Sequence, residues 1–288
     1  MSSLLDPDFL RRLARLRVLV RRRFAGTTGG ARRSSRRGAS VEFADHRAYV
    51  PGDEFRRIDW NAYARLEELV LRLYVAEEDL ALTLFVDRSA SLGVGSPPKL
   101  ETSKRVAAAL AYVALSGSER ISLIPFGEGM DRPLPPTRGK GRIGKVLRRL
   151  DELEASGETS LSRSVEQFLS RRPRPGLVCV ISDFLDREGY QRPIDRLLGE
   201  RHEASLFHIL DTEELDPQPG SDLSLLDSET GARLEVSLDA RALDAYRRRV
   251  RAFLEGIETY ARRRGLAYVQ VGGKIPFEEA LLNYLRAA

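Results

Sequence analysis

Residues 82–92 combine an apolar run with three oxygen-bearing side chains at a regular spacing. The run Leu82-Thr-Leu-Phe-Val stops at Asp87, and hydroxyls follow at Ser89 and Ser91. In open α/β folds ligands bind beyond the carboxyl ends of the strands, where these side chains would converge. One carboxylate and two hydroxyls are hard oxygen ligands, which favour Mg²⁺ or Mn²⁺ over zinc. Taken alone, the spacing is also typical of a strand-to-loop turn with local Asx and Ser hydrogen bonds.

A second apolar strand supplies partners for this cluster. Residues 177–182 end at Asp183, and the polar loop Ser156-Gly-Glu-Thr-Ser lies between the two strands and opens a helix. The order of a D-x-S-x-S strand end, a G-x-T-S loop and a strand-final Asp resembles the metal-ion-dependent adhesion site of von Willebrand factor type A domains. The resemblance implies a bound Mg²⁺ (or Mn²⁺ or Ca²⁺) whose ligands, some through water, would be Asp87, Ser89, Ser91, Thr159 and Asp183.

The elements that would position these residues alternate along the chain. We expect a mostly parallel, doubly wound α/β sheet of the von Willebrand A-like, Rossmann type, because strands and helices alternate and right-handed crossovers bring Asp87 and Asp183 to one edge. The expected strands are 69–74, 82–87, 120–126, 177–181, 204–210 and 266–271, and the expected helices are 100–116, 143–153, 161–171, 187–200, 240–264 and 276–285. A Pro-rich edge segment is expected at 131–137 and a hairpin at 223–236.

Length and composition suit one large α/β domain with a smaller appendage in 288 residues. The longest apolar stretch, 106–115, is shorter than the ~20 residues that span a bilayer. The amino terminus has no secretory apolar region, and the single cysteine, Cys179, lies in a core strand. These features predict a cytoplasmic protein.

We divide the chain into three parts. These are a basic helix and loop at 1–40, a segment at 41–76 that packs on the main domain, and that main domain at 77–288.

The positive charge is local. Residues 1–40 hold eleven arginines and two acids, while the rest of the chain is slightly acidic. This region could dock on nucleic acid, anionic lipid or an acidic protein. Only Phe24 accompanies the arginines, however, so stacking on bases is not indicated. The alternative is an amphipathic helix over 8–23 with a solvated arginine face.

Residues 41–65 pack aromatics, a Pro-Gly turn, acids and arginines into a short segment. The pieces Glu42-Phe43, Arg47-x-Tyr49, Pro51-Gly-Asp53, Asp59-Trp60 and Ala64-Arg65, followed by the D-x-S-x-S strand, resemble the signature of a bacterial family known as domain of unknown function fifty-eight. The resemblance is strong over residues 35–210. It implies a von Willebrand A-like domain and an association with MoxR-type AAA+ ATPases. Many relatives begin with two membrane helices, which this sequence lacks.

The segment has two interpretations. It could form a second binding surface. Alternatively, Phe43, Tyr49, Ile58 and Trp60 could cover a sheet edge while Arg47, Arg57, Arg65, Asp53 and Asp59 form ion pairs.

The remaining motifs give weaker indications of function. Residues 93–99 lack phosphate-loop spacing, and their prolines remove N–H groups, so a lid beside the metal is the better interpretation. His46, His202 and His208 lack zinc-site spacing.

No evident base accompanies the predicted cation, so catalysis is not indicated. Two functions remain: a noncatalytic, cation-dependent adaptor or co-chaperone of a MoxR-type ATPase, or a nucleic-acid-binding protein that uses the arginine-rich N-terminus and the helix at 240–264.

Overall fold

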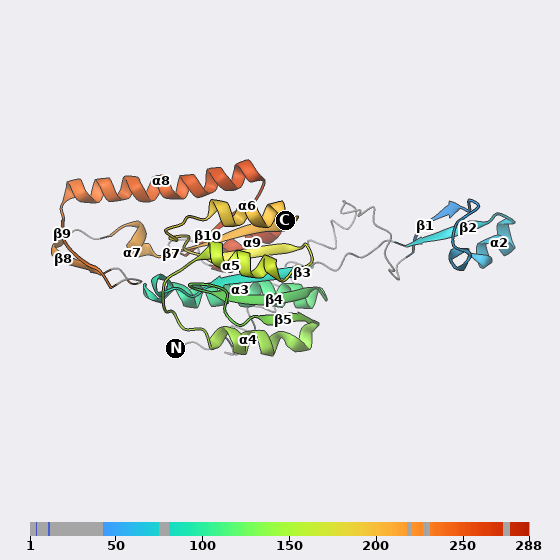
Figure 1. Cartoon of the computed structure of the whole chain (residues 1–288), viewed down its shortest axis with the longest axis horizontal. Coiled ribbons are helices and arrows are strands. Elements are labelled where there is room, and N and C mark those ends of the chain that lie inside the picture. Colours follow the sequence, from blue (N-terminus) through green and yellow to red (C-terminus); the bar gives the residue numbers. More distant parts are fainter. Residues whose placement is uncertain are drawn as a thin grey trace. The chain divides into compact units, whose positions relative to one another are not determined.

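The computed structural model describes Leu4, Arg11 and residues 43–74, 81–217, 220–226, 228, 231–272 and 277–287. The chain forms two compact units, one of residues 26–79 and the other of residues 1–25 together with 80–288 (Figure 1). The predicted helix at 8–23 lies outside the described residues except for Arg11, which is helical.

The larger unit is built on a six-stranded sheet in the order β10-β7-β6-β3-β4-β5. All neighbouring strands pair in parallel except β5, which pairs with β4 in the antiparallel direction at one edge. The predicted mostly parallel, doubly wound sheet is therefore confirmed. Its strands are β3 (Ala81–Asp87), β4 (Arg120–Phe126), β5 (Leu134–Arg138), β6 (Leu177–Ser182), β7 (Glu203–Leu210) and β10 (Ala267–Gly272).

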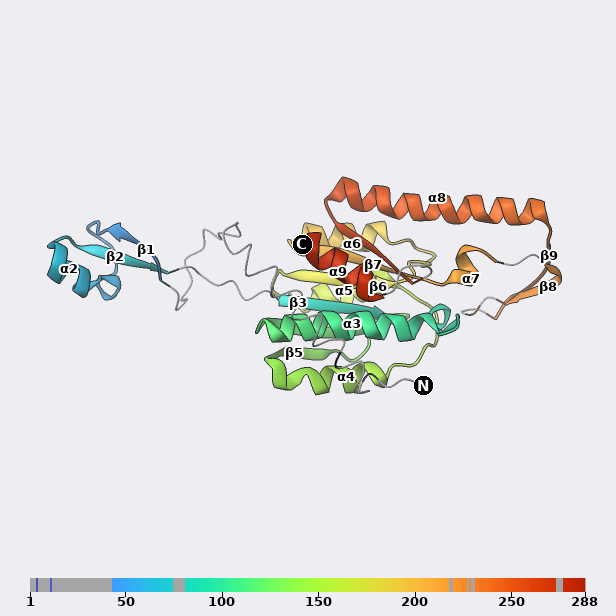
Figure 2. The ribbon, with the colours of Figure 1, turned by 180° about the vertical axis from the view of Figure 1, so that it is seen from behind.

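Helices cover both faces of this sheet. One face carries α3 (Lys99–Ser116), α4 (Ile143–Asp151) and α9 (Phe277–Ala287), which lie in front in Figure 2. The other carries α5 (Leu161–Ser170), α6 (Gln191–Gly199) and α8 (Ala240–Arg264). Each face has its own apolar cluster, and alternate strand residues enter different clusters: Leu84 and Val86 join one, and Phe85 the other. Burial on both faces explains why the strands are continuous apolar runs.

The start of one helix and the form of one edge segment differ from the sequence prediction. Helix α6 begins at Gln191 and not at 187, because the preceding residues form a turn with Gly189 at φ +78° and the side chain of Asp186 accepting the Glu188 N–H. The Pro-rich segment is a strand, β5, whose register against β4 shifts between Ile121 and Leu123. It tolerates Pro135 and Pro136 because edge positions and bulges are the places in a sheet where a backbone N–H can be missing. A short 3-10 helix, η3 (Lys140–Arg142), leads into α4.

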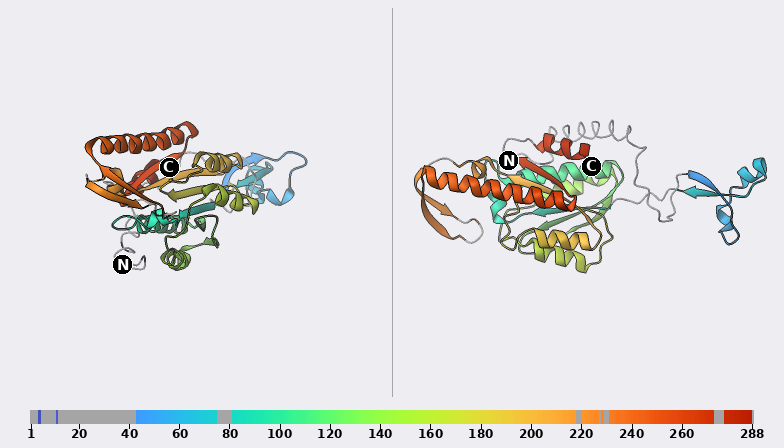
Figure 3. Two further views of the ribbon diagram at one scale, coloured as in Figure 1. Left: turned by 60° about the vertical axis from the view of Figure 1, so that its left-hand side comes forward. Right: turned by 90° about the horizontal axis from the view of Figure 1, so that it is seen from above.

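An arm follows β7 beyond the carboxyl ends of the strands (Figure 3). It begins with the short helix α7 (Thr212–Leu215) and continues as the antiparallel hairpin of β8 (Gly220–Leu226) and β9 (Arg233–Leu238), which confirms the predicted hairpin. Helix α8 then returns to the sheet. It is capped by Asp239, whose carboxylate accepts the Ala242 N–H, and ends at Gly265 in the left-handed region.

The smaller unit pairs β1 (Phe43–Ala48) with β2 (Val70–Tyr74) and carries η1 (Phe55–Arg57) and α2 (Trp60–Leu66) between them. Asp59 caps α2 and accepts a hydrogen bond from His46 Nε2 at 3.0 Å. Ile58 is buried as the structural interpretation expected, but Trp60 is 59% exposed within the unit. Among the described residues, no helix of either unit is long and apolar enough to cross a membrane.

Candidate metal centre

The site is built where two parallel strands end side by side. Asp87 is the last residue of β3, and β6, which ends one residue before Asp183, is its direct neighbour in the sheet. Both carboxylates are almost fully buried, at 0% and 2% exposure. The adjacent strand ends therefore bring the two predicted acids to one edge, as the crossover rule requires.

Asp87 is surrounded by hydrogen-bond donors. Its Oδ1 accepts the Ser89 N–H at 2.9 Å, and its Oδ2 accepts the Ser182 hydroxyl at 2.6 Å. The Thr159 hydroxyl lies 3.5 Å from the same Oδ2. Ser182 is not among the predicted site residues, because the sequence places it within the apolar strand. Its hydroxyl also accepts the Phe184 N–H, so it ties the end of β6 to Asp87.

Burial raises the pKa of Asp87 to about 7, and repulsion from Asp183 adds to the shift, while the bonds from Ser182 and Ser89 oppose it. An ionised carboxylate is costly here because water is excluded and a second carboxylate lies nearby. A cation bound beside the two acids would remove this cost.

The predicted hydroxyl ligands come from two loops. Ser89 and Ser91 lie at the start of η2 (Ala90–Gly93), and their Oγ atoms are 3.0 Å apart in a buried contact. The loop that carries Thr159 is fixed by a backbone bond from Ala90 N to Gly157 O at 2.9 Å. Gly157 sits at φ +74°, where a side chain would be strained. Four of the five predicted ligand residues, all except Asp183, are thus linked by contacts at this edge: Thr159 with Asp87, Asp87 with Ser89, and Ser89 with Ser91.

Asp183 has a partner that the sequence did not reveal. Lys99, the first residue of α3, donates from Nζ to Asp183 Oδ2 at 2.8 Å and to Glu214 Oε1 at 2.6 Å. The other oxygen of Asp183 accepts the Leu185 N–H at 3.3 Å. Burial lowers the pKa of Lys99, but attraction to the two carboxylates outweighs this and leaves the pKa above its ordinary value. The site therefore contains a permanent ammonium ion.

These residues fit a divalent ion that is held mainly by hydroxyl oxygens. Among the described residues no cluster of three or more His, Cys, Asp or Glu could hold a metal. The site depends on hydroxyls, and hard neutral oxygens beside carboxylates suit Mg²⁺ or Mn²⁺. Asp87, Ser89, Ser91 and Thr159 would hold the ion. Because Asp183 is already paired with the Lys99 ammonium through Oδ2, Asp183 fits a contact through water better than a direct one.

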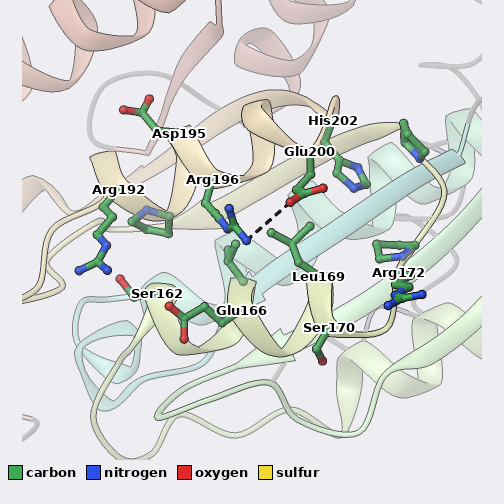
Figure 4. A pocket seen from close by; sticks show the side chains of 14 residues that line it. Ser162, Glu166, Leu169, Ser170, Arg172, Arg192, Asp195, Arg196, Glu200 and His202 are labelled. Carbon is green, nitrogen blue, oxygen red and sulfur yellow. Dashed lines mark ion pairs between the residues drawn. The ribbon is translucent and has the colours of Figure 1, made fainter.

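A different hollow, of about 1070 Å³, lies between α5 and α6 (Figure 4). Three of its charged side chains form ion pairs within the fold. Arg196 lies 3.6 Å from Glu200, and Asp195 lies 2.7 Å from Arg264 of α8. Buried His202 also lines it, with an Nδ1 that has no hydrogen-bond partner among the described residues. Within the part of the chain that the structure describes, no hydrogen bond joins Ser162 or Ser170 of this hollow to His202 or Glu166, so we place the functional site at the carboxyl edge.

Residues 45–255 match the family described as Protein of unknown function DUF58. The chain belongs to this family. Uncharacterized protein Rv1480 of Mycobacterium tuberculosis is 29% identical over 249 residues, which cover 84% of this chain and 78% of that protein. Uncharacterized protein MAV169 of Mycobacterium avium is 36% identical over 78 residues, covering 26% of this chain and 46% of that protein. Membership confirms the family resemblance inferred from residues 42–65, whereas association with a MoxR-type ATPase stays a prediction.

Two solved structures show a distant likeness. Conserved hypothetical protein BatB from Bacteroides thetaiotaomicron has a TM-score of 0.46 at 15% identity, covering 73% of this chain and 100% of that one. Manganese-loaded TRAP protein from Plasmodium vivax has a TM-score of 0.36 at 19% identity, covering 46% and 57%. Neither likeness bears on the site of this chain.

Proposed function

We propose that this protein is a noncatalytic, divalent-cation-dependent interaction module whose bound ion captures an acidic side chain of a partner protein. The observation that carries the proposal is the convergence of Asp87, Ser89, Ser91 and Thr159 at one sheet edge, next to Asp183. Hydroxyl ligands leave most of the ion's charge uncompensated, so it can still attract a carboxylate from outside.

The surroundings of the site support a binding role over hydrolysis. A metal-assisted hydrolase needs a base or a metal-activated water within reach. Two ionisable groups beside the acids are Lys99, which both Asp183 and Glu214 hold in its charged form, and His208. Burial lowers the pKa of His208 to about 4, and its Nδ1 is engaged with Tyr268 Oη at 2.8 Å. Neither group is poised to take a proton from water at the ion.

The partner that we propose is a MoxR-type AAA+ ATPase, with the protein as adaptor or co-chaperone in the assembly or maturation of a client complex. This rests on the family to which the chain belongs and on the acid-binding chemistry of the site. The smaller unit would add a second surface, since Phe55, Trp60 and Leu66 expose more than half of their area within it. Large exposed apolar patches mark protein interaction sites.

Nucleic acid binding is less well supported. The basic segment at 1–40 lies almost wholly outside the described residues. In α8 several arginines are engaged by acids: Arg247 with Asp216 at 2.7 Å and Arg262 with Glu258 at 3.2 Å. Phosphate contacts would give a steep fall of affinity with salt, which a filter-binding titration measures.

The deciding experiment is a pull-down of the MoxR-type ATPase by the full chain, in Mg²⁺ or in EDTA. Thr159→Val removes one hydroxyl ligand at nearly constant volume, and Thr137→Val on the edge strand β5 is the matched control. We expect binding by the wild type and the control in Mg²⁺, and loss of binding in EDTA or in Thr159→Val. Binding that EDTA does not change but that is lost when residues 1–40 are removed would refute the metal bridge, that is, the capture of a partner's acid by the bound ion. It would make the basic segment the docking site.

A further inference from the structure

The ammonium group of Lys99 joins the metal centre to a carboxylate from a distant part of the chain. Its side chain is 1% exposed and lies between Asp183 at the end of β6 and Glu214 of α7. The two acids differ in burial: the side chain of Asp183 is 2% exposed and that of Glu214 is 34% exposed. Glu214 is therefore the outer carboxylate on Lys99, the one that faces water.

The charges of this group bear on how an acidic partner can bind. With all groups ionised, Asp87, Asp183 and Glu214 carry three negative charges, and Lys99 carries one positive charge. A divalent cation brings the sum to zero, so the loaded site offers a partner's carboxylate no net attraction while Glu214 stays in place. Once Glu214 leaves Lys99, the remaining group has a net charge of +1. Electrostatic complementarity then favours an incoming acid.

We propose that Glu214 is an internal substitute for the partner's acidic side chain, and that the partner binds by replacing it on Lys99. The inference rests on the proposed function, since it assumes that the site receives a carboxylate. It adds that the acid is recognised by the buried ammonium as well as by the ion, and that the free protein holds its own competitor.

The elements that hold Glu214 are suited to exchange. Helix α7 has four residues, and two of its contacts with α8 are polar and exposed: Tyr246 Oη donates to the Glu214 carbonyl at 2.6 Å, and Arg247 pairs with Asp216. Exposed pairs of this kind contribute little to stability. Only the Glu214 side chain has to rotate away, because its carbonyl can stay bound to Tyr246.

The rim of the site indicates what flanks the partner's acid. Among the described residues of the larger unit, the large apolar side chains that are exposed are Val94, Leu185 and Tyr246. Each is joined to a site residue: Val94 N bonds to Ser91 O, Leu185 N to Asp183 Oδ1, and Tyr246 Oη to Glu214 O. Apolar contacts around a central polar anchor are the usual composition of a binding interface. The fitting partner presents an acidic residue between apolar neighbours.

The test is a chemical-shift titration of the full chain, loaded with Mg²⁺, with the peptide Ac-Ser-Leu-Glu-Leu-Ser-NH₂ and its Gln counterpart. The variants are Glu214→Gln and the matched control Glu213→Gln, which makes the same charge change at the neighbouring, exposed position. We expect Glu214→Gln to bind the Glu peptide about fivefold or more tightly than the wild type. Glu213→Gln should behave as the wild type, the Gln peptide should not bind, and Leu185→Ser should weaken binding.

Two results would overturn the exchange. One is equal affinity of the wild type and Glu214→Gln for the Glu peptide, and the other is no binding by any variant. A repeat in EDTA separates the exchange from the proposed function. Tighter binding by Glu214→Gln in both Mg²⁺ and EDTA supports the exchange on Lys99 and contradicts the metal bridge. Equal binding by both proteins that EDTA abolishes refutes the exchange and leaves the metal bridge standing.

Discussion

Lys99 Nζ donates to Asp183 Oδ2 at 2.8 Å, and the two side chains are 1% and 2% exposed at the carboxyl edge of the sheet. The pair links the first turn of α3 to the end of β6. Replacing Lys99 with Met leaves Asp183 as a buried charge without its main partner. Breaking a buried pair in this way costs about 3–5 kcal/mol. We expect Lys99→Met to lower the free energy of unfolding by that order in urea denaturation.

The double variant Lys99→Met, Asp183→Asn provides the control for that loss. It removes both charges, so it should recover most of the stability. A double variant as unstable as Lys99→Met alone would mean that the loss comes from packing of the lysine stem and not from the ion pair.

Asp87 gives the metal prediction. At 100 times its dissociation constant, Mg²⁺ should stabilise the wild type by about 2.7 kcal/mol. Asp87→Asn should abolish this response, while Asp244→Asn on the exposed face of α8 should keep it. Calorimetry with and without Mg²⁺ measures both. An equal Mg²⁺ response in the wild type and in Asp87→Asn would refute the site.

The same variant has a second expected effect. Because the pKa of Asp87 is raised to about 7 in the fold, folding disfavours its ionised form, and the cost is fully present above that pH. Without metal at pH 8, Asp87→Asn should therefore be more stable than the wild type. A less stable variant would show that the carboxylate is compensated within the site.

Buried His202 should make stability depend on pH with the opposite sign to the effect of Asp87. Burial lowers the pKa of His202 in the folded chain below its ordinary value of about 6.5. Between the lowered pKa and the ordinary pKa, the unfolded chain binds a proton that the folded chain does not. Stability is lost as the pH falls through this window, by up to about 1.4 kcal/mol per pH unit. The unfolding free energy of the wild type should fall relative to that of His202→Leu from pH 7 to pH 5. A difference that does not change with pH would contradict the buried neutral imidazole.

Trp60 tests the second surface. Its side chain is 59% exposed in the smaller unit, so Trp60→Ser should change thermal stability little. We expect the variant to weaken capture of the MoxR-type ATPase, since exposed tryptophans are frequent hot spots. Undiminished capture by a Trp60→Ser, Phe55→Ser double variant would restrict the interface to the larger unit.

The noncatalytic assignment can be checked directly. The purified chain with Mg²⁺ should not turn over phosphate esters, nucleotides or peptides, because neither Lys99 nor His208 beside the acids is placed to take a proton from water. Turnover that disappears in Asp183→Ala would overturn the assignment.

The strands, their order along the chain and the convergence of Asp87 with Asp183 followed from apolar runs and the crossover rule. Lys99 and Glu214 could not be found this way. A lysine after two prolines is typical of a surface position, and its partner lies 115 residues further along the chain. Burial of a charge depends on tertiary packing, which periodicity does not encode. The exposure of Trp60 was undecidable for the same reason, because an aromatic side chain serves a core and a binding surface equally well.

Helix α8 gives the arm a mechanical property. Its 25 residues extend over about 37 Å, and its deeply buried contacts Ile257 and Ala261 lie towards the end that returns to the sheet. Nearer the hairpin, Leu243 is buried as well, and Tyr246 and Arg247 attach the helix to α7. The helix therefore connects the hairpin, α7 and the sheet through one continuous element. Force applied to the β8–β9 hairpin would act through α8 on the bond from Tyr246 to the Glu214 carbonyl, and so on the carboxylate that Lys99 holds.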